Sequence, residues 1–307
     1  MSEPTLDRFH GRTLANKLAT ALAATRPAFI TASILPVLAA GALAAYTSTA
    51  AIPMHLLVLA TINIALIHAG ANILNDYFDA ISGNDAANTG FVHPFSGGSR
   101  FIQNDVLSER EVLHIGVVLM VSGALLGLLF VWITGPALLA IGIVGTLLAI
   151  TYSSPPCLAC RGLGDVVIGI CFGLLPVAGT CLILTGKIPA QAWWLGAVIA
   201  CFVAAILWVN SIPDIPADRS AGKMTLPARL GASAAALVLP VWFAAGFLLL
   251  LASPLPRETW IALAGAVPAV LASRAAISAS LSAAMPLTIL THALVCALLI
   301  GGLVWSG

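Results

Sequence analysis

The stretch "ANILNDYFDAISGND", residues 71–85, ends an apolar segment and carries three Asn and three Asp. Unsatisfied polar groups are costly inside a membrane. If the helix continues to about residue 79, four of these side chains fall at positions i, i+3, i+4 and i+7, which is one stripe of one helix. The four are Asn72, Asn75, Asp76 and Asp79. The spacing therefore predicts a functional polar face at the end of this helix.

The chain around this stretch is too apolar for a soluble fold. Of its 307 residues, 60% are hydrophobic and only 8% are charged, whereas a soluble domain carries about 25% charged residues. A bilayer core needs about 20 apolar residues per helix. Nine such runs are bounded by Pro, Gly or charge, at residues 27–46, 53–75, 112–133, 136–153, 165–185, 190–212, 233–252, 258–275 and 286–305. We therefore expect an all-α, multispanning membrane protein with nine transmembrane helices in a bundle around a central cavity.

The first 25 residues are mixed polar and show neither the early basic cluster nor the cleavage site of a signal peptide. Within them, "TLANKLATALAATR" begins a segment with helical periodicity and a basic edge. Two interpretations stay open, an amphipathic helix on the membrane surface and a simple lead-in. We expect two parts, residues 1–25 as a surface segment and residues 26–307 as a single transmembrane domain.

The charges lie mostly on one side of the predicted bundle. Nine spans place the N-terminus on the same side as the loops after the even-numbered spans. Only Lys187 and Arg257 of the 13 basic residues lie on the other side, so the positive-inside rule places the N-terminus in the cytoplasm. Only Glu258 of the 12 acidic residues lies on that other side, although acids contribute little to topology. We therefore expect an integral protein of a plasma or bacterial inner membrane, with an active site at its cytoplasmic face.

A second acidic cluster follows the sixth run, in "NSIPDIPADRSAGK", residues 210–223. Asn210, Asp214 and Asp218 recur at i, i+4 and i+8, although the two prolines between them predict a kink or an unwound turn. Both clusters end even-numbered spans and can converge across a bundle. Converging carboxylates repel each other unless a cation neutralises them. Their hard oxygens suit Mg²⁺, which prefers a few carboxylates together with substrate phosphates.

Basic and hydroxyl side chains stand beside these acids on the same side. Arg100 follows "FSGGS", residues 95–99, whose glycines allow backbone N–H groups to approach an anion. Lys223 follows the second cluster. Three more residues follow the fourth span, Tyr152, Ser153 and Arg161. A cation channel needs the acids but not the cations, so the combination predicts a phosphorylated substrate.

Other residues carry weaker signals. Three roles stay open for Asp85, which are a ligand, a contact to the acceptor and a solvated loop residue. Cys157 and Cys160 form a CxxC with no second Cys or His pair nearby, so the spacing does not predict zinc. His68 and His292 lie in apolar runs, where we expect a hydrogen bond to a neighbouring helix rather than catalysis. The net charge of +1 indicates nothing about nucleic acid, and we expect no nucleic-acid partner; the oligomeric state is not predicted.

With these motifs, the chain resembles the UbiA superfamily of intramembrane aromatic prenyltransferases. The motifs that carry the resemblance are "NDYFDAISGND" at residues 75–85 and "DIPADRSAGK" at residues 214–223, after the second and sixth spans. "GGS" at 97–99 and "RGLGD" at 161–165 are most similar to the 1,4-dihydroxy-2-naphthoate prenyltransferase branch of menaquinone synthesis. One departure is the segment "PPCLACRG", where relatives often carry a Lys or Arg. Either Arg161 supplies this charge alone or the acceptor is handled differently, so the precise aromatic substrate stays open.

The resemblance implies Mg²⁺-dependent transfer of a polyprenyl group from its diphosphate to an aromatic acceptor. It implies that metal is held by Asn75, Asp79, Asp214 and Asp218. It implies catalytic roles for Asp79, Asp214, Asp218, Lys223 and Arg100, and substrate contacts for Asn72, Asp76, Asp85, Ser99, Tyr152, Ser153, Arg161 and Asn210. Cation–π stabilisation of an allyl cation is a hypothesis for Phe78, Phe172 and Trp208.

Three other functions remain to be weighed. A cyclase of the same superfamily ionises a prenyl diphosphate without an acceptor, and only product analysis separates it. A cation-coupled transporter is expected to carry carboxylates at the span centres and inverted repeats, and no midspan acid is present in the nine runs. The absence of the DGxxAR sequence argues strongly against a CDP-alcohol phosphotransferase.

Overall fold

The computed structural model describes residues 3–9 and 13–307, and nine helical segments in these residues are long and apolar enough to cross a membrane. Each overlaps one of the nine predicted runs, so the predicted nine-helix, all-α architecture is confirmed. Seven are single helices, α3 (Pro27–Thr47), α4 (Met54–Ile81), α6 (Glu109–Thr134), α7 (Pro136–Ser153), α10 (Ala190–Asn210), α13 (Ala232–Ala252) and α15 (Leu281–Ser306).

The other two spans are composite. The fifth joins α8 (Gly164–Gly169), a π-helical turn (Ile170–Leu174) and α9 (Leu175–Thr185). The eighth begins as a 3₁₀-helix (Arg257–Gly265) and continues as α14 (Ala266–Ile277). π-helical turns commonly mark functional sites, and the one in the fifth span lies beside the cavity described below.

Helix boundaries follow local chemistry. Pro27 and Pro136 begin α3 and α7, where proline needs no intrahelical partner. Gly135, at φ 106°, joins α6 to α7 in a tight hairpin. At the start of α6, Ser108 and Glu111 form a reciprocal capping box. Each boundary therefore rests on a residue type suited to it.

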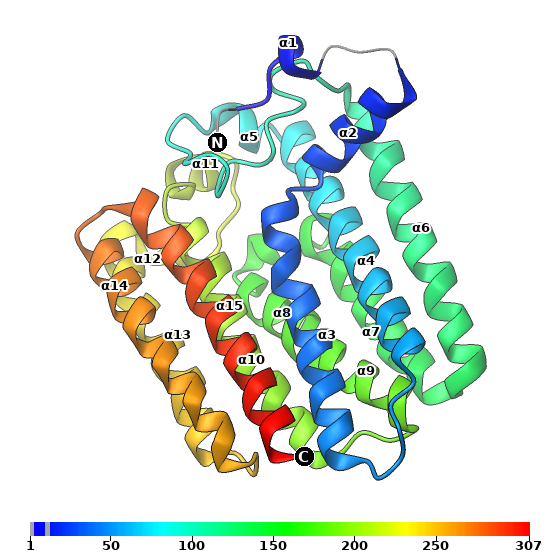
Figure 1. Ribbon diagram of the computed structural model, residues 1–307. Helices are drawn as coiled ribbons and strands as arrows, with labels where there is room; N and C mark the ends of the chain where they lie inside the picture. Colours follow the sequence, from blue (N-terminus) through cyan, green and yellow to red (C-terminus); the bar gives the residue numbers. More distant parts are fainter. Residues whose placement is uncertain (1–2, 10–12) are drawn as a thin grey trace.

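The spans form one bundle (Figure 1). Helices α4, α6 and α7 lie on one side, α13 and α14 on the other, and α3, α10 and α15 lie between them. The short helices α1 (Leu6–Phe9), α2 (Leu14–Ala24), α5 (Asn84–Ala87), α11 (Ile215–Ser220) and α12 (Leu226–Leu230) follow or precede spans toward one end, and the C-terminus lies at the opposite end. The N-terminal helices and both acidic clusters therefore share an end of the bundle, whereas its cytoplasmic location stays a prediction.

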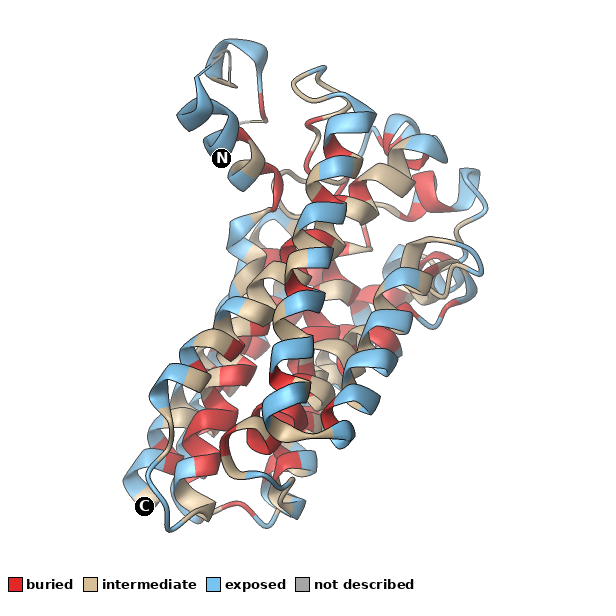
Figure 2. Ribbon diagram, turned by 90° about the vertical axis from the view of Figure 1, so that its right-hand side faces the viewer, coloured by how far each residue is buried: buried red, intermediate tan, exposed pale blue. Residues whose placement is uncertain are grey.

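Close helix contacts depend on small residues. A Cβ added to Gly173 would lie 2.5 Å from the carbonyl oxygen of Gly196, so the fifth span and α10 touch through their backbones. A Cβ on Gly70 of α4 would lie 2.8 Å from Met120 of α6. Small residues of this kind allow membrane helices to approach closely. The buried positions gather inside the bundle and the exposed ones along its outward faces (Figure 2).

The N-terminal helix α2 has an apolar face that the bundle does not cover. Leu14, Leu18 and Leu22 recur at i, i+4 and i+8, and each is more than half exposed. This pattern is typical of an amphipathic helix. Its location on the membrane surface, and the division at residue 25, stay predictions.

Candidate active site

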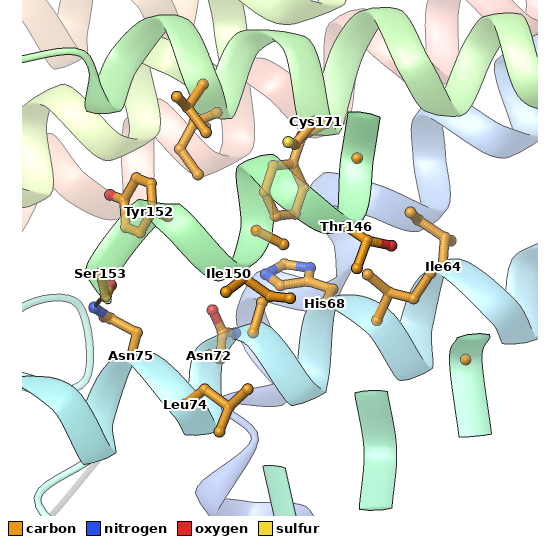
Figure 3. Close-up of a pocket in the computed structure, with 18 of the residues that line it drawn as sticks. Ile64, His68, Asn72, Leu74, Asn75, Thr146, Ile150, Tyr152, Ser153 and Cys171 are labelled. Carbon is orange, nitrogen blue, oxygen red and sulfur yellow. Dashed lines mark hydrogen bonds between the residues drawn. The ribbon is translucent and has the colours of Figure 1, made fainter. Parts of the chain in front are cut away.

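An apolar cavity of about 900 Å³ lies inside the bundle and reaches polar residues at one end, in agreement with the predicted central cavity. Its wall is built mainly from α4, α6, α7 and the fifth span. Figure 3 shows Asn75, Tyr152 and Ser153 near one end, and Ile64 and Thr146 toward the other. A cavity with a polar end and an apolar body fits a ligand with a polar head and an apolar tail.

Two members of the α4 stripe face this polar end. Asn75 donates through Nδ2 to Asp79 Oδ2 at 3.2 Å. It also donates to Ser153 Oγ at 2.7 Å, and Figure 3 shows these two side chains next to each other. Both Asp79 carboxylate oxygens accept hydrogen bonds from Lys223 Nζ at 3.0 Å. The helix α4 thereby meets α7 and the segment after α11 at one point, and all of these side chains line the cavity.

The other two members of the stripe turn toward different partners. Asp76 is 4% exposed and accepts the backbone N–H of Ser99 at 3.1 Å. Asn72 lines the cavity and donates to the carbonyl oxygen of Thr25 at 3.2 Å. The predicted stripe therefore exists as a helical face. Asn75 and Asp79 face the polar end of the cavity, whereas Asp76 and Asn72 bond to the backbone at Ser99 and Thr25.

The second cluster spans the end of α10 and the start of α11. Helix α10 ends at Asn210, turns follow, and Asp214 precedes α11, as the prolines predict. Asp214 accepts from Asn88 Nδ2 at 2.7 Å and from the Gly97 N–H at 3.4 Å. The three predicted residues of this cluster, Asn210, Asp214 and Asp218, all line the cavity.

Asp218 is held from three directions. It accepts from Asn84 Nδ2 at 3.2 Å and from Thr225 Oγ1 at 3.3 Å, and Lys223 Nζ lies 3.9 Å away. Burial raises the pKa of Asp218 to about 6, against the opposing effect of the Lys223 charge. Burial also raises the pKa of Asp214. Added positive charge at this site would therefore stabilise the ionised form of both carboxyls.

Lys223 joins the two clusters. Burial by itself would lower the pKa of this ammonium, but the Asp79 and Asp218 carboxylates and Tyr152 outweigh it and raise the pKa above its ordinary value. Lys223 therefore carries its charge at any physiological pH. A buried cation of this kind attracts an anionic substrate group to the polar end of the cavity.

Asp85 is buried, which excludes the solvated-loop interpretation. It is 3% exposed and lines the cavity. Burial, followed by the charges of Asp79 and Asp76, raises the pKa of Asp85 to about 8. A Cβ on Gly98, which has a φ of 73°, would lie 2.6 Å from Asp85 Oδ2. The "GGS" segment thus requires glycine because the backbone passes directly over this carboxyl.

The donor set fits Mg²⁺ shared with a substrate. In the described residues, no three His, Cys, Asp or Glu side chains form a ready metal cage. Mg²⁺ is usually bound by one or two carboxylates plus substrate phosphates. In the part of the chain that the structure describes, Asn84 Oδ1 and Asn210 Oδ1 are buried and have no hydrogen-bond partner. Hard oxygens from both clusters are therefore available at the site, but a protein-only cage is not.

Four predicted residues are not in the cavity wall. Asp76 and Ser99 bond to each other behind it. Arg100 donates through Nη1 to the carbonyl oxygen of Asp85 at 2.7 Å and stacks 4.3 Å over the Phe91 ring. Arg161 is exposed, and its Nε donates to the Pro156 carbonyl at 3.0 Å. Asp76, Ser99 and Arg100 therefore bond to segments that support the cavity wall. Direct contact of any of the four residues with substrate stays a prediction.

The aromatic hypotheses divide in the same way. Phe78 and Phe172 line the cavity. Trp208 was wrongly placed among them, since it is 2% exposed in the packed core and donates through Nε1 to the Ala235 carbonyl at 2.7 Å. Its position on the far side of α10 puts it out of reach of the cavity.

Several site residues were missed. Asn84 and Asn88 bond to Asp218 and Asp214; their i, i+4 spacing directly after the first cluster was the available signal. Arg26 lines the cavity, and its Nη2 donates to the Phe95 carbonyl at 2.9 Å. Because Arg26 directly precedes a span, its position in the sequence indicated membrane orientation but not a place in the cavity wall.

His68 and His292, both expected to bond to a neighbouring helix, differ in their contacts. His68 lines the cavity, and its Nδ1 lies 2.8 Å from Ser33 Oγ on α3. This contact confirms the expected bond to a neighbouring helix. His292 instead contacts Cys296 on its own helix, with Nε2 3.5 Å from the sulfur.

Comparisons with known proteins identify relatives of this chain. The UbiA prenyltransferase family model matches residues 33–283. A 1,4-dihydroxy-2-naphthoate octaprenyltransferase of Mycobacterium tuberculosis is 32% identical over 82% of this chain and 82% of its own length. The UbiA prenyltransferase domain-containing protein 1 of Dictyostelium discoideum is 28% identical, and the match covers 70% of this chain but only 65% of that relative.

Solved structures share the fold. A UbiA homolog from Archaeoglobus fulgidus, bound to DMAPP and Mg²⁺, has a TM-score of 0.63 at 16% identity, covering 93% of this chain and 98% of that one. A UbiA homolog from Aeropyrum pernix K1 has a TM-score of 0.62 at 21% identity, covering 88% and 97%. The family match extends over most of the transmembrane bundle and includes both acidic clusters. The chain therefore belongs to the UbiA prenyltransferase family.

Proposed function

We propose that this protein transfers a polyprenyl group from a prenyl diphosphate to an aromatic quinone precursor, such as 1,4-dihydroxy-2-naphthoate, in a Mg²⁺-dependent reaction. The observation that carries the proposal is the meeting of Asp79, Asp218 and Lys223 at the polar end of a 900 Å³ apolar cavity. The name of the M. tuberculosis relative supports the acceptor class. The A. fulgidus neighbour, solved with DMAPP and Mg²⁺, supports the donor class and the metal.

The donor's two parts match the two parts of the cavity. Lys223, Tyr152 and Ser153 stand where a diphosphate head would bind, and the apolar wall of α4, α6 and α7 would hold the polyprenyl chain. Asn75, Asp79, Asp214 and Asp218 would hold Mg²⁺, which supplies positive charge to the diphosphate. A chain that enters between helices reaches the cavity directly from the lipid.

The protein's own groups lower the barrier in two ways. As the allylic C–O bond breaks, negative charge grows on the diphosphate, and the fixed charge of Lys223 stabilises it without reorganisation. The apolar wall keeps water from the allyl cation, and the rings of Phe78 and Phe172 offer cation–π stabilisation. The acceptor's ring carbon then forms the new C–C bond, and the ring loses a proton, or its carboxylate in the naphthoate branch.

Product analysis tests the proposal. Purified protein is incubated with Mg²⁺, farnesyl or geranylgeranyl diphosphate and a panel of aromatic acceptors, and the products are identified by mass. We expect a prenylated acceptor and free diphosphate, both abolished by EDTA and restored by added Mg²⁺. Diphosphate release with a cyclised hydrocarbon and no acceptor adduct would indicate the cyclase instead. Cation-coupled uptake with no diphosphate release would indicate the transporter.

A further inference from the structure

Cys157 and Cys160 form a disulfide in the segment between α7 and α8, with their Cα atoms 5.3 Å apart. Both are partly exposed and line a second cavity of about 360 Å³. This second cavity shares part of its wall with the large one, at Asp79, Ser153 and Lys223. The disulfide therefore lies in the wall of a space that borders the proposed diphosphate site.

Backbone hydrogen bonds connect the disulfide loop to that site, among them one at each of the two cysteines. The Cys157 N–H donates to the Ser154 carbonyl at 2.6 Å, directly after the Ser153 that Asn75 contacts. The Cys160 carbonyl accepts the N–H of Met224 at 3.1 Å, directly after Lys223. The S–S bond closes the loop between these two attachments. Its cleavage removes a covalent constraint on the position of one attachment relative to the other, and leaves the Leu158 N–H bond to the Thr151 carbonyl at 2.8 Å in place.

The chemistry of the compartment bears on this bond. The positive-inside rule places this loop in the cytoplasm, where small thiols reduce accessible disulfides and the ones that form are usually redox-responsive. The remaining cysteines, Cys171, Cys181, Cys201 and Cys296, are free. In the residues that the structure describes, this pair is therefore the one disulfide available for exchange.

We propose that Cys157–Cys160 is a redox-active site that undergoes thiol–disulfide exchange with a low-molecular-weight thiol and that its oxidised form orders the diphosphate site. A thiolate attacks one sulfur, the S–S bond breaks, and a mixed disulfide forms while the other cysteine leaves as a thiolate. A second thiolate then attacks the mixed disulfide. Two electrons pass from the two small thiols to the pair, which takes up two protons from water, and the small thiols leave as their own disulfide.

The exchange is tested without reference to activity. The purified full-length protein is equilibrated with reduced or oxidised glutathione and alkylated, and the peptide with residues 154–163 is weighed by mass spectrometry. We expect two added alkyl groups after reduction, none after oxidation, and full reversal between the two states. Labelling of Cys201 on α10 serves as the internal control. A pair that stays alkylatable in oxidised glutathione, or stays unlabelled in reduced glutathione, overturns the proposal.

The ordering effect is tested by amide hydrogen exchange and by kinetics. Reduction is expected to speed exchange at the Met224 N–H, because its acceptor carbonyl belongs to Cys160. It is also expected to raise the KM for prenyl diphosphate about 3-fold or more, since binding groups lose their fixed positions. The double variant Cys157→Ser, Cys160→Ser should match the reduced protein and not respond to glutathione, whereas Cys201→Ser should respond like the wild type.

The KM measurement rests on the proposed function. The alkylation and amide hydrogen-exchange measurements do not. If neither redox state turns over a prenyl diphosphate, the proposed function fails, and the Met224 exchange rate alone decides this inference. Equal Met224 exchange in both redox states overturns it. A glutathione response that persists in the double serine variant overturns it as well.

Discussion

Lys223 is the residue on which the site's electrostatics depend. It lies 3.0 Å from the Asp79 carboxylate and 3.9 Å from that of Asp218, with its side chain 17% exposed. Such a partly buried ion pair adds little to stability by itself, but removing one partner leaves an uncompensated charge. The arrangement is therefore better explained by anion binding than by stability.

Loss of either carboxylate should abolish turnover. We expect Asp79→Ala and Asp218→Ala to lower kcat for prenyl transfer by at least ~100-fold, because each removes charge that positions the diphosphate and metal. The proteins should still purify from membranes as folded species by size exclusion. Asp105→Ala, an exposed carboxylate in the same end of the molecule, is the matched control. Activity like the wild type in either of the first two variants contradicts the assignment.

Asp85 should make stability depend on pH. Its pKa is raised from 3.8 to about 8, so the folded protein keeps this proton where the unfolded chain has lost it. Its contribution to stability is present below the unfolded pKa and is lost as pH rises toward about 8. In EDTA, Asp85→Asn should show a smaller fall in Tm over this range than the wild type. Equal pH profiles for the two proteins would refute a protonated, buried Asp85.

At the scale of elements, the site is built by one helix that continues and one that is interrupted. Helix α4 runs without a break through Asn72, Asn75 and Asp79 to Ile81. Helix α10 ends at Asn210, and its cluster resumes on α11. Periodicity predicted the first because no helix-breaking residue stands in the stripe. Proline predicted the break in the second but not its direction, which depends on the packing of α11 against α5.

The contact between the fifth span and α10 should be intolerant of added volume. A Cβ on Gly173 would meet the Gly196 carbonyl oxygen at 2.5 Å and Ala200 Cα at 2.7 Å. Because both neighbours are backbone, Gly173→Ala should destabilise the protein by about 1–3 kcal/mol. Thermal unfolding in detergent measures this. Gly142→Ala, where a Cβ meets nothing within 4 Å, should leave the Tm unchanged or raise it, and equal losses in both variants would contradict the contact.

In the molecule as a whole, the nine spans found in residues 3–9 and 13–307 place the two acidic clusters at one end and the C-terminus at the other. At the end with the acidic clusters, Lys223 forms ion pairs with both Asp79 of α4 and Asp218 of α11, and so links the two clusters. The outward faces are apolar and exposed, as at Trp132 and Trp305, which are 84% and 85% exposed. The fold therefore presents an apolar surface suited to lipid along its sides and a cluster of polar side chains at one end.

Sidedness can be measured directly. In a chain whose six native cysteines are replaced by Ser, Ser82→Cys and Lys187→Cys each add one exposed thiol, at opposite ends of the bundle. A membrane-impermeant maleimide should label Ser82→Cys only from the cytoplasmic side and Lys187→Cys only from the other side. Reversed labels would invert the orientation, and labels from the same side would contradict an odd number of spans between residues 82 and 187.

Local patterns in the chain were enough to predict the span number, the all-α fold and the two acidic clusters at one end. A bilayer forces each span to satisfy its own backbone hydrogen bonds, so span length and charge bias are local properties that one chain displays. The tertiary packing sets the rest: Asn75 bonds to Ser153 and Asp79 to Lys223, whereas Asp76 bonds to the Ser99 N–H and Asp85 is buried. These contacts depend on where the loop after α4 folds against α11, and no local periodicity encodes a distance between segments so far apart in the chain.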